Sequence, residues 1–166
     1  MNISYTTISS PIGIILVAAT KEGICAVHIT DEVVGAVEML KKEFPKAETL
    51  SRNDNAMLRY AEAVAGYLSN TLHPDLPLHM QGTEFQKHIW RILMTIPPGE
   101  TRTYAQIADM AGRPSAVRAV ASACGKNKIA LLIPCHRIVR KDGTPSGYRW
   151  GLKRKEYLLK SEQLQL

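Results

Sequence analysis

Cys135 and His136 are the residues of this sequence whose types and spacing point most directly to chemistry. They stand in the run 134–137, directly after the apolar segment 129–133. A cysteine attacks as its thiolate, and nearby cations favour that form. The alternative is a buried, inert thiol, but a histidine and an arginine follow where a buried strand would continue with apolar residues. The segment therefore predicts a nucleophilic cysteine at the end of a strand over 129–133.

The partner of this cysteine depends on how the chain runs after it. Neighbouring side chains of a strand point to opposite faces. His136 can therefore act as a base for Cys135 only through a water molecule, or if the chain turns at this point. Glu162 stands near the end of a basic segment, 152–163, that predicts a helix. Taken singly, Glu162 is expected to be solvated.

Three short strands are predicted at the start of the chain, over 3–8, 13–19 and 23–29. Alternating or β-branched apolar residues between turn signals are typical of a meander. Cys25 and His28 are three residues apart in the third strand and are expected on opposite faces, which makes them poor co-ligands of a metal. We expect a buried Cys25 and no chemistry in this part of the chain.

Two helices are predicted after these strands. Asp31 is expected to cap the first, which runs to about residue 44. Its apolar stripe consists of Val33, Val34, Val37, Met39 and Leu40. Apolar residues at helical spacing predict the second over 54–68. The proline-containing segment 70–79 is interpreted as a linker.

Further helices are predicted in the second half of the chain. Thr83 and Thr103 each have a glutamine three residues later, which is the pattern of a capping box. These boxes predict helices over about 84–96 and 104–110. A third helix is expected over 116–124, after a turn that contains a glycine.

The last two of these helices, with their tight turn, form the pattern of a helix-turn-helix. Ser115 is expected to cap the second helix, whose alanines would let its backbone approach a surface closely. Alanines read little base sequence, so the pattern favours a protein that binds duplex DNA without much sequence preference. Turn signals over 137–149 predict a hairpin beside it, which would form a wing.

Charge divides the sequence into two unlike halves. Residues 1–81 hold six Lys and Arg against nine Asp and Glu, a net charge of −3, whereas residues 82–166 hold fifteen against six, a net charge of +9. A basic half indicates an anionic partner such as nucleic acid, although solubility alone is an alternative. Together with the helix-turn-helix pattern, this charge favours DNA.

Composition bounds the class of protein. The chain has 166 residues, of which 45% are hydrophobic and 22% are charged, as in globular proteins of one or two small domains. No apolar run approaches the ~18 residues of a membrane span, and the first residues lack the features of a signal peptide. Three cysteines without metal or redox spacing favour a reducing compartment. We therefore expect a cytoplasmic protein that does not enter a membrane.

A set of ordered motifs resembles the O6-alkylguanine-DNA alkyltransferases, most closely the C-terminal domain of the bacterial adaptive-response alkyltransferases. In chain order the motifs are Gly82–Gln86, Ile89–Trp90, Ile96–Glu100, Thr103–Tyr104, Arg118–Val120, Asn127, Ile133–Arg137 and Ser146–Tyr148. The likeness covers about residues 81–162, whereas residues 1–80 fit only in length and in their order of strands and helices.

The resemblance implies an α+β fold in two domains. Residues 1–80 would form a small α/β domain of the ribonuclease H-like kind, which serves as a scaffold. Residues 81–166 would form a mostly helical, winged helix-turn-helix alkyltransferase domain. No cofactor and no metal are expected, and the family implies a monomer.

The resemblance also implies a reaction. The partner is double-stranded DNA that contains O6-alkylguanine, and O4-alkylthymine is expected as a second lesion. The damaged base is flipped out of the duplex into a pocket. A cysteine then takes its alkyl group irreversibly, so each molecule acts once.

Five residues receive roles in the reaction through the resemblance. Cys135 accepts the alkyl group, His136 deprotonates it through a water molecule, and Glu162 orients His136. Asn127 stabilises the turn before the cysteine. Tyr104 crowds the target phosphate and donates a hydrogen bond to N3 of the leaving guanine.

Other residues are implied in contacts with the substrate. Arg118 would fill the gap that the flipped base leaves. Further contacts with DNA are expected from Thr103, Tyr104, Ser115, Ala116 and Ala119. The pocket is expected to be lined by Tyr148, Arg149 and Ile138. Some relatives place a small hydroxyl residue at the position of Arg149, so Arg149 is expected either to narrow the pocket or to add charge to it.

Two other classes of function compete with a suicidal alkyltransferase. A DNA-binding regulator or lesion sensor would need no nucleophile, so the presence of Cys135 with His136 and Glu162 argues against it. A thiol hydrolase would turn over and would not require DNA, so the basic second half argues against that.

Overall fold

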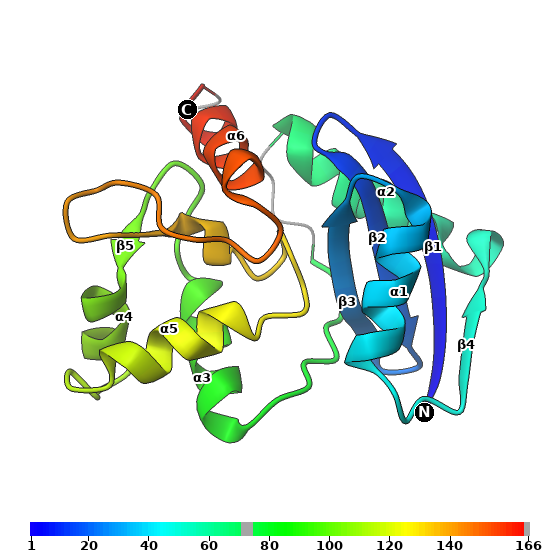
Figure 1. Cartoon of the computed structure of the whole chain (residues 1–166), viewed down its shortest axis with the longest axis horizontal. Helices are drawn as coiled ribbons and strands as arrows, with labels where there is room; N and C mark the ends of the chain where they lie inside the picture. The colour runs from blue at the N-terminus through cyan, green and yellow to red at the C-terminus, as the bar shows by residue number, and fades with distance from the viewer. Residues whose placement is uncertain (71–74, 165–166) are drawn as a thin grey trace. The chain divides into compact units, whose positions relative to one another are not determined.

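The computed structural model describes residues 1–70 and 75–164 and divides the chain into two compact units. The units are Met1–Met80 with Lys128–Ala130, and Gln81–Asn127 with Leu131–Leu166. The first is built on a sheet and the second is mostly helical (Figure 1). This mixture confirms the α+β class. Within the described residues, no helix is both long and apolar enough to cross a membrane.

A four-stranded sheet forms the centre of the first unit, in the order β3-β2-β1-β4. β1 (Asn2–Ser10), β2 (Gly13–Thr20) and β3 (Gly23–Thr30) form the predicted antiparallel meander. β4 (Thr49–Arg52) pairs with β1 in parallel. The sequence does not predict β4, because its four residues are mostly exposed and show no apolar alternation.

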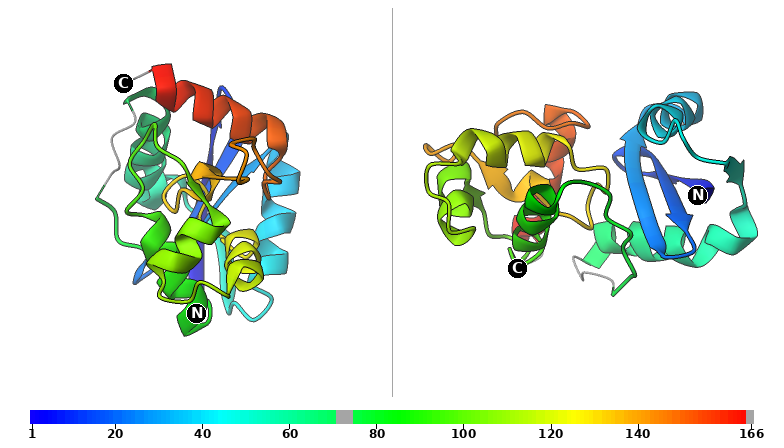
Figure 2. Two further views of the ribbon diagram at one scale, coloured as in Figure 1. Left: turned by 90° about the vertical axis from the view of Figure 1, so that its left-hand side faces the viewer. Right: turned by 90° about the horizontal axis from the view of Figure 1, so that it is seen from below.

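Helix α1 (Val33–Glu43) lies on one face of this sheet and α2 (Asp54–Asn70) lies on the other (Figure 1, Figure 2). The predicted cap at Asp31 is wrong, because Glu32 occupies the N-cap position and its side chain makes no capping hydrogen bond. The predicted stripe is also wrong at Val34, which is 70% exposed. Val37 and Leu40, which belong to the same predicted stripe, do pack against the sheet.

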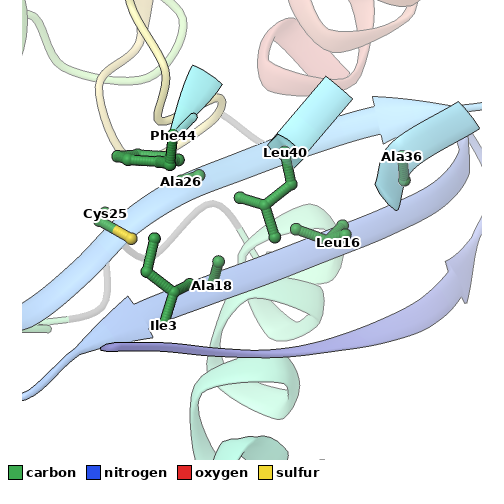
Figure 3. Close-up of a cluster of buried hydrophobic side chains, with 8 residues drawn as sticks. All are labelled: Ile3, Leu16, Ala18, Cys25, Ala26, Ala36, Leu40 and Phe44. Carbon is green, nitrogen blue, oxygen red and sulfur yellow. The ribbon is translucent and has the colours of Figure 1, made fainter. Parts of the chain in front are cut away.

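Buried side chains fill the space between α1 and the sheet (Figure 3). They are Ile3, Leu16, Ala18, Cys25, Ala26, Ala36, Leu40 and Phe44. A bulge between Ala18 and Ala19 shifts the register, so Cys25 and Ala26 both join the cluster although they are consecutive. The strict alternation that predicted opposite faces for Cys25 and His28 therefore breaks here. Cys25 is buried, as expected.

Two segments add short bridges to β3. Leu78 forms a parallel bridge with Ile24, although the sequence predicts only a linker over 70–79. The part of that linker over 71–74, with His73, lies outside the described residues. Ile129 bridges in the same way to Val27.

The second unit contains three packed helices, of which α4 (Tyr104–Met110) and α5 (Val117–Gly125) carry the helix-turn-helix pattern. α3 (Glu84–Leu93) packs against both of them. Both predicted capping boxes are confirmed: Thr83 and Thr103 each accept a hydrogen bond from the backbone of the glutamine three residues later, and each glutamine bonds back.

The predicted cap at Ser115 is wrong. Helix α5 begins one residue later than expected, and Ala116 holds the N-cap position without a side-chain hydrogen bond. The turn before it is tightened by Gly112, whose φ of +73° lies in the left-handed region that favours glycine. A buried hydrogen bond of 2.9 Å from Trp90 Nε1 to the Ala123 carbonyl ties α5 to α3.

Short elements and one last helix complete the second unit. β5 (Arg102–Thr103) pairs in parallel with β6 (Ile138–Val139). The loop after β6 folds back on itself, with an antiparallel bridge from Val139 to Pro145. Helix α6 (Leu152–Leu164) packs against the 3₁₀ turn η1 (Cys135–Arg137).

Candidate active site

The cysteine lies on a turn rather than at the end of a strand. Residues 129–133 form an isolated bridge and turns, and Leu131 has a φ of +70°. The predicted strand is therefore wrong. The apolar residues of this run are buried, at most 2% exposed, but they do not form a strand. A short apolar run cannot by itself distinguish a strand from another buried segment. The turn η1 that follows breaks the strand alternation at Cys135 and His136.

His136 is bound to Glu162 inside the second unit. Its Nε2 lies 2.7 Å from Glu162 Oε1, and the two side chains are 0% and 4% exposed. The sequence by itself predicts a solvated Glu162, which is wrong, whereas the resemblance predicts this pairing. Helix α6 carries the carboxylate into the interior beside η1.

Arg137 also holds this carboxylate, which the sequence analysis did not foresee. Its Nε donates to both carboxylate oxygens at 3.2 and 3.1 Å, and Nη2 donates to Oε1 at 2.9 Å. Nη1 donates to the Ile96 carbonyl at 2.6 Å. The fork of an arginine fits a carboxylate in this way. Its place next to His136 in the sequence was the available signal.

Asn127 connects the turn to the sulfur. Its Nδ2 donates to the Ile133 carbonyl at 3.0 Å and to Cys135 Sγ at 3.3 Å. Asn127 is fully buried. The same amide therefore holds the backbone before the cysteine and supplies a donor to the thiol.

Burial dominates the protonation of these groups. Desolvation raises the pKa of Cys135 to about 11, although the Asn127 hydrogen bond and the Lys155 charge act in the opposite direction. Desolvation also lowers the pKa of His136, against the influence of Glu162. The resting site thus contains a neutral thiol and a neutral imidazole. The lowered cysteine pKa expected from nearby cations is therefore not found in this resting site.

Glu162 is the charged member of the set. Burial acts to raise its pKa, but the hydrogen bonds and charges of His136 and Arg137 together lower it to about 2. A carboxylate beside a neutral imidazole places the ring proton on Nε2. Nδ1, which makes no hydrogen bond with any described residue, then carries the lone pair that can accept a proton.

Cys135 opens on a pocket of about 230 Å³ in the second unit. Its lining residues are Tyr104, Ala121, Cys124, Gly125, Cys135, Gly147, Tyr148 and Arg149. Two of the three residues expected in the pocket, Tyr148 and Arg149, are among them. Ile138 is not: it is fully buried in β6, and its contact with the substrate stays a prediction.

Arg149 forms one wall of this pocket. Its Nη1 donates to the Asn127 carbonyl at 2.9 Å, and its guanidinium lies 5.5 Å from the ring centre of Trp150. Tyr148 packs edge-on against the same Trp150 ring. A stacked guanidinium is held in one orientation, so Arg149 forms a fixed wall of the pocket.

The residues expected to touch DNA lie outside the pocket lining, with the exception of Tyr104. Thr103 caps α4, Arg118 and Ala119 are exposed on α5, and Ser115 and Ala116 precede that helix. They therefore occupy the helix-turn-helix. Among the described residues, no group of three or more His, Cys, Asp or Glu side chains could hold a metal.

This site defines a class of protein: one with a buried Cys-His-Glu set beside a pocket in a unit that contains a helix-turn-helix. Comparison with known proteins agrees. The model of the "6-O-methylguanine DNA methyltransferase, DNA binding domain" matches residues 84–164, and that of the corresponding "ribonuclease-like domain" matches residues 3–73. The chain belongs to the methylated-DNA–protein-cysteine methyltransferase family.

Individual relatives extend over nearly the whole chain. The chain is 43% identical over 160 residues to the bifunctional transcriptional activator/DNA repair enzyme Ada of Escherichia coli (strain K12), which covers 96% of this chain but 45% of Ada. It therefore spans about half the length of that relative. A methylated-DNA–protein-cysteine methyltransferase of Methanosarcina barkeri is 42% identical, with 96% of each chain covered.

A solved structure shows the same fold. The structure of Mycobacterium tuberculosis OGT in complex with DNA superposes with a TM-score of 0.84 at 33% identity, over 98% of this chain and 94% of that one. These comparisons confirm the resemblance that the motifs carried. They also confirm the expected fold class.

Proposed function

We propose that this protein repairs DNA by moving the alkyl group of O6-alkylguanine in duplex DNA onto Cys135. The observation that carries the proposal is the opening of Cys135 on a pocket while His136 and Glu162 stand buried behind it. The transfer is irreversible, and each molecule acts once. O4-alkylthymine is proposed as a second lesion, and no cofactor is required.

The chemistry begins from a neutral thiol. His136 accepts the thiol proton at Nδ1 through a bridging water molecule, and Glu162 stabilises the imidazolium that forms. The sulfur attacks the alkyl carbon, the S–C bond forms, and the C–O6 bond breaks with its electron pair left on guanine. Tyr104 donates a hydrogen bond to N3 of that base, which offsets the developing negative charge.

Recognition of the duplex is assigned to the helix-turn-helix. The basic charge of residues 82–166 supports an anionic partner. Arg118, exposed on α5, would fill the gap in the base stack once the lesion has left it. The DNA in the structure of the M. tuberculosis relative supports the same partner. Thr103, Ser115, Ala116 and Ala119 would contact the backbone around the lesion.

The organisation of the chain is part of the proposal. Residues 81–166 would carry the reaction and residues 1–80 would serve as its scaffold. We propose a monomer that works in the cytoplasm, which the three free cysteines support.

A repair assay tests this function. A duplex with one O6-methylguanine is mixed with an excess of protein, and the bases are then analysed after hydrolysis. The expected result is conversion of the lesion to guanine by the wild-type chain and none by Cys135→Ser, which keeps its affinity for DNA. Repair by Cys135→Ser would overturn the assignment. Tight binding of the lesion without repair by the wild type would instead indicate a lesion sensor.

A further inference from the structure

Lys155 is a buried cation that the proposed reaction does not use. It lies on α6 with 1% of its surface exposed, and no carboxylate of the described residues forms an ion pair with it. Burying a charge without an opposite partner destabilises a fold. Its ammonium group donates a hydrogen bond to the hydroxyl of Ser146, with 3.2 Å between Nζ and Oγ.

Ser146 also forms a hydrogen bond with Tyr104, which lines the pocket. Its Oγ lies 2.7 Å from the hydroxyl of Tyr104, and Ser146 is 8% exposed. An ammonium group can only donate, so Ser146 accepts from Lys155. Ser146 can then direct its own proton to the oxygen of Tyr104. In that arrangement the proton of Tyr104 is left for a ligand.

Tyr104 is the end of this chain of hydrogen bonds, and it lines the pocket together with Cys135. It is the first residue of α4, next to the capping residue Thr103, so its backbone is fixed. Its χ angles alone would let the hydroxyl point in several directions. The contact with Ser146 removes that freedom.

We propose that Lys155 and Ser146 are positioning residues, which hold the Tyr104 hydroxyl as a hydrogen-bond donor to the leaving base. Hydrogen bonds in a chain polarise one another, so the ammonium at one end strengthens the donor at the other. This inference rests on the proposed function and adds two residues to it. Tyr104 keeps its proton, and the electron pair of the broken C–O6 bond stays on guanine.

The proposal separates the two halves of the reaction. Attack by the sulfur belongs to Cys135 and its partners, whereas departure of guanine depends on Tyr104. Iodoacetamide also alkylates a cysteine, but its leaving group is iodide, which needs no hydrogen bond. Loss of Ser146 should therefore slow transfer from O6-methylguanine and leave alkylation by iodoacetamide nearly unchanged. The Lys155 charge also lowers the pKa of Cys135, so its loss should slow both reactions, and methyl transfer more than alkylation by iodoacetamide.

The experiment compares single-turnover methyl transfer with iodoacetamide alkylation of Cys135, followed by peptide mapping. The variants are Ser146→Ala, Lys155→Gln and Lys155→Arg, with Lys153→Gln as the matched control, since Lys153 is exposed on the same helix. Ser146→Ala and Lys155→Gln should slow methyl transfer about tenfold, because they weaken one donor in the site. Lys155→Arg keeps the positive charge and should transfer methyl at close to the wild-type rate. Lys153→Gln should lower the rate only slightly, through a small loss of affinity for DNA.

A double-variant cycle completes the test. If Ser146 acts through Tyr104, Ser146→Ala should have no further effect when Tyr104→Phe is already present. The inference would be overturned if Ser146→Ala slowed methyl transfer equally with and without Tyr104→Phe. It would also be overturned if Ser146→Ala slowed alkylation by iodoacetamide as much as methyl transfer, or slowed neither. In each of these cases, methyl transfer by the wild type would still uphold the proposed function. Absence of transfer by the wild type would overturn both.

Discussion

The Nε2 atom of His136 lies 2.7 Å from Oε1 of Glu162, and both residues are buried. Because Glu162 is a carboxylate with a pKa of about 2, it holds the imidazole with its proton on Nε2. Nδ1 is then the basic atom. The pair thus prepares His136 to accept a proton from a cysteine that is itself neutral at rest.

The first prediction concerns the charge of Glu162. Glu162→Gln keeps the shape of the side chain but leaves the Arg137 guanidinium buried without its counter-ion. Breaking a buried ion pair in this way costs about 3–5 kcal/mol. We expect a lower free energy of unfolding in urea and a single-turnover transfer rate at least about tenfold lower.

Glu156→Gln is the control for that experiment, since Glu156 is exposed on the same helix. It should match the wild type in both measurements. If Glu162→Gln also matched the wild type, the buried carboxylate would have no part in the reaction.

The second prediction concerns pH. A folded pKa of about 11 for Cys135 means that the thiolate fraction of the free protein rises about tenfold per pH unit from pH 7 to 10. The rate of alkylation by iodoacetamide at Cys135 should rise in parallel and show no plateau below pH 9.5. A plateau near pH 7 would show that the resting site holds a thiolate, contrary to this account.

The structure also shows why only part of the site could be predicted from the sequence. The capping boxes at Thr83 and Thr103 are local patterns, and the structure confirms them. The nucleophilic character of Cys135 was suggested by its polar neighbours. The turn at Cys135 was not, since an apolar run predicts burial and says little about backbone conformation.

Contacts between distant residues were the other limit. Lys155, Ser146 and Tyr104 meet only in three dimensions, and a lysine in a basic helix predicts a solvated side chain. Glu162 shows the same limit: its sequence position alone predicts a solvated side chain, and only the family resemblance assigned it to the site. Asp31 and Ser115 failed for another reason: a side chain of the right type stood one residue away from the position that begins the helix.

The third prediction concerns the size of the pocket. Arg149 lines it and is held by the Asn127 carbonyl and the Trp150 ring. Arg149→Ser removes that wall, so the ratio of the transfer rate from O6-benzylguanine to that from O6-methylguanine should rise about tenfold. A tenfold change corresponds to about 1.4 kcal/mol, which lies within the range of free energies that overpacking costs. An unchanged or lower ratio would show that Arg149 does not limit the size of the alkyl group.

The fourth prediction concerns base flipping. Arg118 is exposed on α5 and is outside the lining of the pocket. Arg118→Ala should therefore slow repair of a duplex much more than reaction with the free alkylated base. Arg91→Ala, an exposed arginine on α3, controls for loss of charge alone. Equal losses on both substrates in Arg118→Ala would refute its proposed role in the stack.

Intact-mass spectrometry of the protein after reaction with a duplex containing O6-methylguanine tests the central claim most directly. We expect a gain of one methyl group per protein molecule, located by peptide mapping on the segment that contains Cys135. We also expect that the gain stops at one equivalent when the lesion is in excess. A protein of unchanged mass, or a methyl group on Cys25 or Cys124 instead, would contradict the account.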